Sequence, residues 1–141
     1  MSFRAVLDTN ILISGVFWSG MPGKILEGFK EGKFALIVTK EITQEYTAKL
    51  QNIAKKLEAE DRIEEWIQII FEKAIQVKPH CEIKLCRDKK DNIFLDAAAG
   101  GRAKYLVTRD DDLKRDLKLM SVMRRKHGVE IVSVSQFLKL I

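Results

Sequence analysis

The sequence contains few residues of the kinds that form disulfides or bind zinc. Two cysteines, Cys81 and Cys86, and two histidines, His80 and His127, occur among 141 residues. The cysteines form neither a Cys-x-x-Cys pair nor a disulfide framework, and the four residues are too few and too badly spaced for a zinc site. We therefore expect a cytoplasmic protein whose cysteines serve packing.

Long apolar runs, internal repeats and low-complexity segments are also missing. No apolar run approaches the roughly 18 residues that a membrane span needs. The first residues lead straight into a strand-like run at Arg4, which leaves no room for a signal peptide. At this length, and without a linker-like stretch, we expect one domain over residues 1–141.

The charge balance is basic, with 25 Lys and Arg against 20 Asp and Glu, a net charge of +5 and a pI near 9.2. This balance favours a polyanionic partner such as nucleic acid, although a modest positive charge also serves solubility alone. The positive charge is therefore consistent with nucleic-acid binding but is not sufficient evidence for it.

Short apolar runs alternate with helix-like segments along the whole chain. The runs predict strands at residues 4–8, 34–38, 82–86, 105–108 and 129–132. Helices are predicted at residues 23–31, 39–57, 61–75 and 92–99, and a last one is capped by Ser133 or Ser135. Breaks are expected at Gly15 and at Ser19-Gly20. The alternation is typical of an α/β protein with a parallel sheet.

Acidic residues follow two of these apolar strands, as Asp8-Thr9 and as Thr108-Arg109-Asp110. Ligands bind outside the carboxyl ends of strands in open α/β sheets. Asp8 is therefore either the N-cap of the next helix or part of a site. Asp91 stands at or beside the start of the helix at residues 92–99, where the helix dipole favours a carboxylate.

Glu45 lies on the long helix 39–57, beside an apolar stripe formed by Ile42, Tyr46, Leu50, Ile53 and Leu57. A carboxylate at the edge of such a stripe is costly unless it has a partner. It is either an edge residue that reaches solvent or pairs with Lys49, or a member of a site.

The carboxyl ends of parallel strands lie at one edge of the sheet, so Asp8, Glu45, Asp91 and Asp110 can converge. Carboxylates gathered without cations repel one another. All-oxygen ligation is what Mg²⁺ or Mn²⁺ prefers, and such an ion promotes phosphodiester hydrolysis without Cys or His. Hydrogen bonds that orient these acids are expected from Thr9, Asn10 and Thr108. Asp88 and Asp112 are alternative ligands.

Together these segments resemble the signature of the PIN-domain nucleases, and most nearly the VapC-like toxin components of toxin–antitoxin systems. The resemblance rests on four segments in order, Leu7-Asp-Thr-Asn-Ile-Leu12, the Glu45 helix, Asp91-Asn-Ile-Phe-Leu95 and Leu106-Val-Thr-Arg-Asp110. It implies a three-layer α/β/α sandwich around a mainly parallel sheet, metal-dependent cleavage of RNA, a homodimer and, in paired members, inhibition by an antitoxin.

By position, the resemblance makes Asp8, Glu45, Asp91 and Asp110 the metal-binding catalytic acids, with Asp112 as an auxiliary acid. Thr108 is then the hydroxyl of the Thr-x-Asp element. Lys89 departs from the pattern, since related sequences often have proline there, which affects the stiffness of the loop more than its chemistry.

Cations near these acids are candidates for an RNA path. Arg109, Lys114 and Arg115 are predicted to bind RNA, and Lys104 and Lys118 are further candidates. The run at residues 124–127 either contacts RNA as well or is a solvated turn before Gly128. The apolar stripe with Trp66 and Phe71 on the helix 61–75 is either core or a subunit interface.

Other functions fit the same residues less well. A haloacid-dehalogenase-like phosphatase needs a second Asp two residues after the first, and that position is Asn10. A receiver domain needs an acidic pair and a late lysine that are not evident. A non-catalytic RNA-binding protein or a scaffold has no reason to tolerate four neighbouring acids. Housekeeping RNA processing remains an alternative to a toxin.

Overall fold

The structure is a computed structural model that describes residues 3–79, 89–109 and 116–141, without the side chains of residues 89–91. Its sheet is built from β1 (Arg4–Leu7), β2 (Ala35–Val38), β3 (Ile75–Gln76), β4 (Tyr105–Val107) and β5 (Glu130–Val132). The strand order is β3-β2-β1-β4-β5, and every pairing is parallel. The predicted α/β class with a parallel sheet is thereby confirmed.

The central strand β1 is covered on both faces, because Ala5, Val6 and Leu7 are all fully buried. This burial explains why the strand is a continuous apolar run rather than an alternating one. β3 was not foreseen, because a two-residue strand is too short to show a pattern and its Ile75 continues the preceding helical periodicity. The strand predicted at 82–86 lies outside the described residues.

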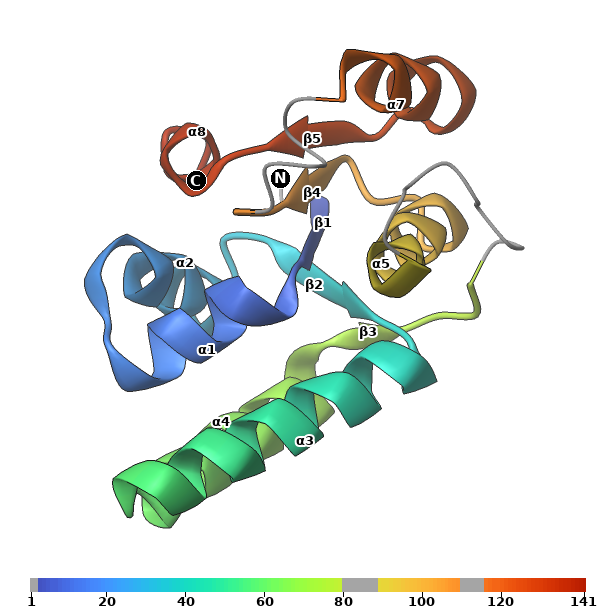
Figure 1. The fold of residues 1–141 in the computed structure, drawn as a ribbon. Helices are drawn as coiled ribbons and strands as arrows, with labels where there is room; N and C mark the ends of the chain where they lie inside the picture. Colours follow the sequence, from blue (N-terminus) through green and yellow to red (C-terminus); the bar gives the residue numbers. More distant parts are fainter. Residues whose placement is uncertain (1–2, 80–88, 110–115) are drawn as a thin grey trace.

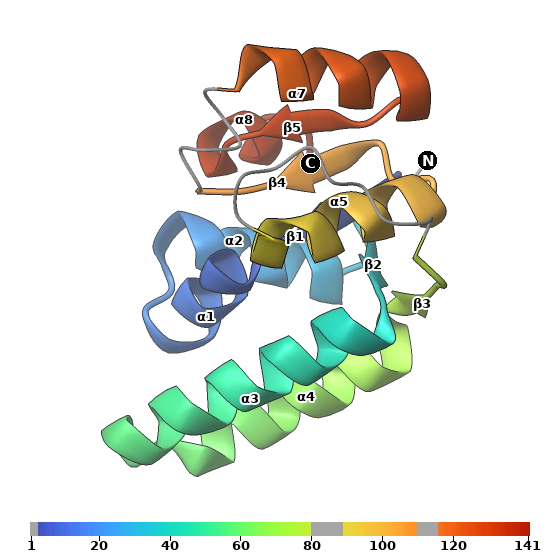
Figure 2. The ribbon, with the colours of Figure 1, turned by 45° about the vertical axis from the view of Figure 1, so that its right-hand side comes forward.

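Helices cover both faces of the sheet in a three-layer arrangement. Figure 1 shows α1 (Thr9–Phe17), α2 (Gly20–Lys30) and α8 (Val134–Leu138) on one side, and α5 (Lys89–Gly100) and α7 (Leu117–Val122) on the other. The helices α3 (Lys40–Leu57) and α4 (Glu60–Lys73) form a hairpin that runs along the β3 end of the sheet in both ribbon views (Figure 2). Within the described ranges, no helix has the length and apolar character needed to cross a bilayer.

The chain does not break at Gly15 as the sequence predicts, since α1 runs through this residue to Phe17. A Cβ atom at Gly15 would lie 2.5 Å from Leu26 Cδ1 and 2.9 Å from the Pro22 carbonyl oxygen. The missing side chain therefore lets α2 approach α1 closely instead of ending the helix. The second predicted break is confirmed, because Ser19 and Gly20 both have positive φ, 53° and 70°.

The α3–α4 hairpin follows the predicted apolar stripes except at its exposed ends. Thr39 caps α3 by accepting a hydrogen bond from the Ile42 N–H at 3.2 Å. Leu57 is 50% exposed, because the buried stripe ends one turn earlier at Ala54. On α4 the ring of Phe71 is 85% exposed and is not part of the core.

The basic run before Gly128 is exposed to solvent, as one of the two interpretations predicts, but it is helical and not a turn. The helix α7 continues into a π-helical segment, η1 (Met123–His127), that ends where Gly128 takes a left-handed conformation with φ 68°. Met123 is fully buried under this segment and anchors it, while residues 124–126 are exposed. Of the two predicted final caps, Ser133 and Ser135, the structure shows Ser133, whose hydroxyl and the Gln136 side chain form a capping box.

Candidate active site

The centre of the candidate site is Asp8, directly after the central strand. Its carboxylate caps α1, because Oδ1 accepts a hydrogen bond from the Ile11 N–H at 2.9 Å. The other oxygen, Oδ2, accepts from the Thr108 hydroxyl at 2.5 Å and from the Arg109 N–H at 3.0 Å. Asp8 is therefore the N-cap, and it is also tied to the end of a second strand.

The sheet register explains why these residues meet. Leu7 lies opposite Val107 in the β1–β4 pairing, and the Asp8 N–H donates to the Val107 carbonyl at 3.1 Å. The next residue of each strand thus reaches the same edge of the sheet. Thr108 is fully buried there, and its own N–H donates to the Val132 carbonyl of β5 at 3.0 Å.

Glu45 reaches the same edge from α3. The Thr9 hydroxyl, directly after Asp8, donates a hydrogen bond to Glu45 Oε2. Among the described side chains, Glu45 does not form the ion pair with Lys49 that an ordinary helix-edge residue would make. Glu45 lies at the edge of an apolar stripe and therefore requires a partner. That partner is Thr9, a residue of the β1–α1 junction.

Tyr46 is a contact of this site that the sequence assigns only to the core stripe of α3. Its buried hydroxyl donates to the Leu7 carbonyl at 2.5 Å, at the last residue of β1. Burial raises the pKa of the Tyr46 phenol well above its ordinary value, and the negative charges of Asp8 and Glu45 raise it further. Both carboxylates thus act on one phenol. The sequence contained one signal for this contact, because Tyr46 is predicted in the buried stripe and a buried phenol needs a hydrogen-bond partner.

Two hydrogen bonds therefore join α3 to the β1–α1 junction, one from Tyr46 to Leu7 and one from Thr9 to Glu45. Glu45 and Tyr46 are adjacent on one strand-facing turn, and Leu7 and Thr9 flank Asp8. The pair of contacts fixes where the Glu45 carboxylate stands relative to that of Asp8.

Arg109 and Asn10 lie on the exposed side of the site. The Arg109 backbone contacts Asp8, whereas its guanidinium Nη1 donates to the Ser14 hydroxyl of α1 at 3.1 Å. The sequence gives no signal for this contact, because Ser14 and Arg109 are 95 positions apart and meet only in the folded chain. Lys118, a further candidate for RNA contacts, is also exposed. Lys104 is exposed too, but it precedes β4 and its N–H donates to the Arg4 carbonyl, so it lies at the opposite edge of the sheet from Asp8. Its prediction as part of the RNA path beside these acids is therefore wrong.

Asp91 stands in the first turn of α5, since that helix begins at Lys89, three residues earlier than predicted. The helix packs on β1, β4 and α3. Figure 2 shows its first turn beside the β1–α1 junction. The Asp91 side chain is not described. Five other predicted residues, Asp88, Asp110, Asp112, Lys114 and Arg115, lie outside the described residues.

The chemistry of the described donors suits a hard divalent cation, because Asp8 and Glu45 offer carboxylate oxygens and their neighbours offer hydroxyls. No three His, Cys, Asp or Glu side chains form a metal-binding group within the described part of the chain. The other two acids of the predicted ligand set, Asp91 and Asp110, have side chains that lie outside that part.

The first testable prediction concerns Tyr46. Changing Tyr46→Phe removes the hydrogen bond to the buried Leu7 carbonyl and should lower the free energy of unfolding by about 1–2 kcal/mol at pH 7. The folded-state pKa lies above that of the unfolded chain, so this contribution is present below about pH 10. It is lost at higher pH, where the unfolded phenol ionises and the folded one does not.

Urea unfolding of both proteins from pH 7 to 11 measures this difference. We expect the gap between wild type and Tyr46→Phe to narrow above about pH 10. Other alkaline groups titrate equally in the two proteins and cancel. A gap that stays constant up to pH 11 would contradict the buried, carboxylate-facing position of this phenol.

Comparison with known proteins adds evidence that is independent of this geometry. The profile of a family described as the PIN domain matches residues 4–112. The chain is also 30% identical, over 116 residues, to an uncharacterized protein of Methanocaldococcus jannaschii, with 80% of this chain and 74% of that protein covered. The matched region includes all four acids proposed from the sequence.

Proposed function

Because the chain belongs to the PIN-domain family, whose members are generally nucleases, we propose that it is a metal-dependent endoribonuclease that hydrolyses RNA phosphodiester bonds. The observation that carries this proposal is the junction at the carboxyl end of β1. There Asp8 is held by β4 and Glu45 is held by Thr9 of the same junction. This arrangement gathers carboxylates where an α/β sheet binds its ligands.

We assign the metal-binding and catalytic role to Asp8, Glu45, Asp91 and Asp110, with Asp112 as an auxiliary ligand and Mg²⁺ or Mn²⁺ as the ion. PIN-domain nucleases typically use divalent metals. When bound, the ion supplies Lewis-acid activation of a water molecule and of the scissile phosphate.

The neighbouring residues of the chain orient these acids. Thr108 and the Arg109 N–H hold one oxygen of Asp8, the Ile11 N–H holds the other, and Thr9 holds Glu45. Hydrogen bonds of this kind fix the direction in which a carboxylate presents its free lone pairs, which is the usual role of groups behind a metal ligand. The Arg109 guanidinium, exposed beside the site, is placed to contact a phosphate of the substrate, and we assign Lys114 and Arg115 the same role.

Within this activity we propose that the protein is the toxin of a type II toxin–antitoxin pair, inhibited by an antitoxin protein, and that it forms a homodimer. The resemblance to VapC-like proteins supports the first part. The exposed Phe71 ring, next to the partly buried Trp66 and Ile67 on α4, supports the second, since large apolar groups on a surface favour association.

The experiment is cleavage of a labelled, mixed RNA pool by the purified protein with Mg²⁺, with Mn²⁺ and with chelator. An Asp91→Asn protein prepared in the same way is the control, because it keeps the shape of the residue and removes one charge. Cutting that requires metal and is lost in this variant supports the proposal. Equal cutting by both proteins indicates a contaminating ribonuclease. RNA binding without cutting, in the presence of bound metal, would favour a non-catalytic RNA-binding protein.

A further inference from the structure

An exposed tryptophan stands at the far end of α1 from the candidate site. Trp18 follows the last residue of this helix and is 60% exposed, although tryptophan is usually well covered. The ring of Phe17 packs edge-on against the Trp18 ring, with the ring centroids 5.8 Å apart. The next residue, Ser19, has a φ of 53° that non-glycine residues rarely adopt. Trp18 is thus held outward by its neighbours.

Trp18 lines a hollow of about 1040 Å³ that lies between α1, α2, α4 and the C-terminal residues. Trp66 lines the same hollow, together with Gly15 of α1 and Gly20, Gly23 and Gly28 of α2. Arg62 closes one side and ties α4 to α1, because its Nη1 donates to the Phe17 carbonyl at 3.3 Å. The hollow is therefore a built feature beside an exposed aromatic ring.

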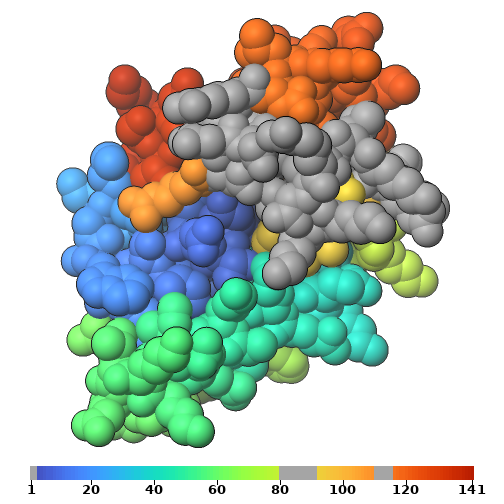
Figure 3. Space-filling view, viewed as in Figure 1, coloured from blue at the N-terminus to red at the C-terminus, as the bar shows by residue number. Residues whose placement is uncertain are grey.

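The surface of α1 connects this hollow with the candidate site. Asn10, Ser14 and Trp18 are spaced four residues apart, so they follow one face of the helix. Asn10 and Trp18 are exposed, and Ser14 is half-buried beneath the Arg109 guanidinium. Figure 3 shows the blue surface of α1 open to solvent above the α3–α4 hairpin. At 1.5 Å per residue, the distance from Thr9 to Trp18 is about 13 Å, which about four stacked nucleotides span.

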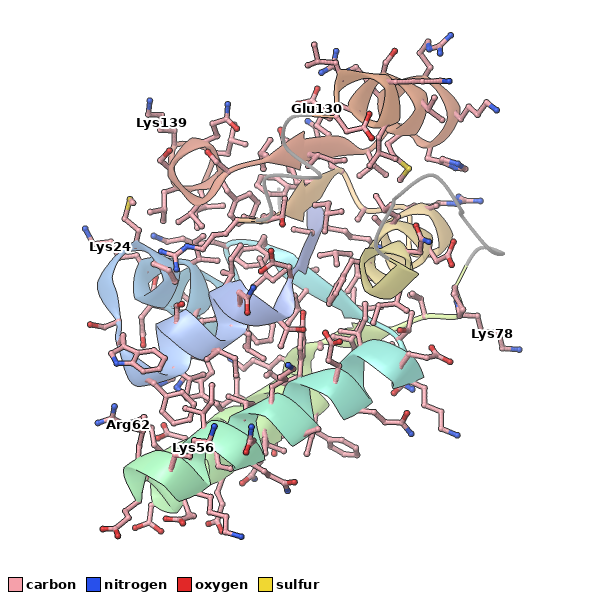
Figure 4. All side chains as sticks on the ribbon, viewed as in Figure 1. Lys24, Lys56, Arg62, Lys78, Glu130 and Lys139 are labelled. Atoms are coloured by element: carbon pink, nitrogen blue, oxygen red, sulfur yellow. The ribbon has the colours of Figure 1, made fainter. Side chains whose placement is uncertain are left out.

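Charge along this strip is positive at the end near Trp18. Lys24 on α2 and Arg62 on α4 line the hollow, and Figure 4 shows both on the left side of the molecule, Lys24 beside α2 and Arg62 beside the hairpin. Two acids, Glu27 and Glu31, lie further along α2, and Glu31 pairs with Lys33 at 3.7 Å. A polyanion is therefore favoured over the first turns of α2 and disfavoured further along.

We propose that Trp18 is a base-stacking subsite for single-stranded RNA, with the strand running from the candidate site along α1. A phosphate lies on Arg109 beside Ser14, a base stacks on the Trp18 ring, and Lys24 and Arg62 attract the phosphates that flank it. Cations interleaved with an aromatic platform are the usual means of binding a single strand without reading its sequence. This inference rests on the proposed RNA substrate and adds a contact outside the reacting centre.

Binding of an unstructured oligouridylate to the metal-free protein, in chelator, tests the subsite without any cleavage. Trp18→Ala should weaken this binding by about 5- to 150-fold, the range expected for loss of one stacked base, whereas Trp18→Phe should stay within a few-fold of wild type. Leu57→Ala is the control. It removes another exposed large apolar side chain, 50% exposed, that does not line the hollow, and it should leave RNA binding unchanged.

Tryptophan fluorescence gives a second readout of the same contact. The chain has two tryptophans, so Trp66→Phe leaves Trp18 as the reporter and Trp18→Phe leaves Trp66. We expect the RNA to quench the fluorescence of the Trp66→Phe protein strongly and that of the Trp18→Phe protein weakly. Oligouridylates of two to eight nucleotides should begin to quench only when they are long enough to span α1.

Wild-type RNA affinity in Trp18→Ala, with an unchanged melting temperature, would overturn the inference and leave the hollow to a protein partner. Equal quenching of both reporters would also overturn it. Failure of the proposed function would look different. If RNA binds through Trp18 but is not cut in the presence of metal, the subsite is supported and the nuclease activity is contradicted. If Trp18→Ala cuts RNA with metal and with an unchanged KM, the nuclease activity is supported and the subsite is contradicted.

Discussion

Asp8→Asn is expected to lower the rate of metal-dependent RNA cleavage by more than about 100-fold, because groups that merely orient a metal ligand already contribute about 10- to 100-fold. The substitution keeps the size of the side chain and removes the charge that the cation requires. Mn²⁺ titrated into the protein and followed by calorimetry should show weaker binding to the variant by a similar factor.

The same change should destabilise the fold. Asp8 accepts hydrogen bonds on both oxygens, from the Ile11 N–H on one side and from the Thr108 hydroxyl and the Arg109 N–H on the other. An asparagine has one oxygen, so if it keeps the helix cap, its NH₂ group faces the Arg109 N–H. The unpaired donors should cost about 1–3 kcal/mol, measured by urea unfolding in chelator.

Asp116→Asn is the matched control, because Asp116 also caps a helix but, within the described part of the chain, accepts through one oxygen, at 2.9 Å from the Leu119 N–H. Asparagine serves equally well as an N-cap, so this variant should keep both stability and cleavage. An Asp8→Asn protein as stable as wild type would contradict the three-donor environment of Asp8. Wild-type cleavage by that protein would remove Asp8 from the reaction.

The parts of the fold that burial dictates were predictable from the sequence. A strand buried on both faces has to be a short apolar run, so β1, β2 and β4 were found within a residue or two. Thr39 and Ser133 were found as caps because a side-chain oxygen at the start of a helix satisfies a free N–H group. The strand β3 and the helical course of residues 117–127 were missed, since their structure comes from neighbours that a local pattern does not contain.

The sequence predicted the edge of the sheet at which the candidate site lies, but not the hydrogen bonds within the site. Parallel topology places residues after β1 and β4 together, so the proximity of Asp8 and Thr108 follows from their places in the sequence. The Arg109 N–H on Asp8 and the Tyr46 hydroxyl on the Leu7 carbonyl depend on how the β4 loop and α3 are rotated. That rotation is set by packing over the whole domain core, which no short segment encodes.

Glu45→Gln is expected to lose cleavage as Asp8→Asn does, but to keep or raise the stability of the fold. Cleavage should fall by more than about 100-fold for the same reason as in Asp8→Asn. The fold should not suffer, because a glutamine oxygen still accepts from the Thr9 hydroxyl. One of the two negative charges that act on the Tyr46 phenol disappears, which relieves repulsion in the metal-free protein.

Loss of activity together with equal or higher stability is the mark of a residue kept for function at a cost to the fold. Cleavage assays and melting curves in chelator measure the two effects on one preparation. Glu64→Gln, at an exposed acid past the first turn of α4, is the matched control and should change neither. If Glu45→Gln cleaves like wild type, Glu45 is an ordinary helix-edge residue. If the variant melts well below wild type, the contact between Thr9 and Glu45 is structural, and the metal would have to be held without α3.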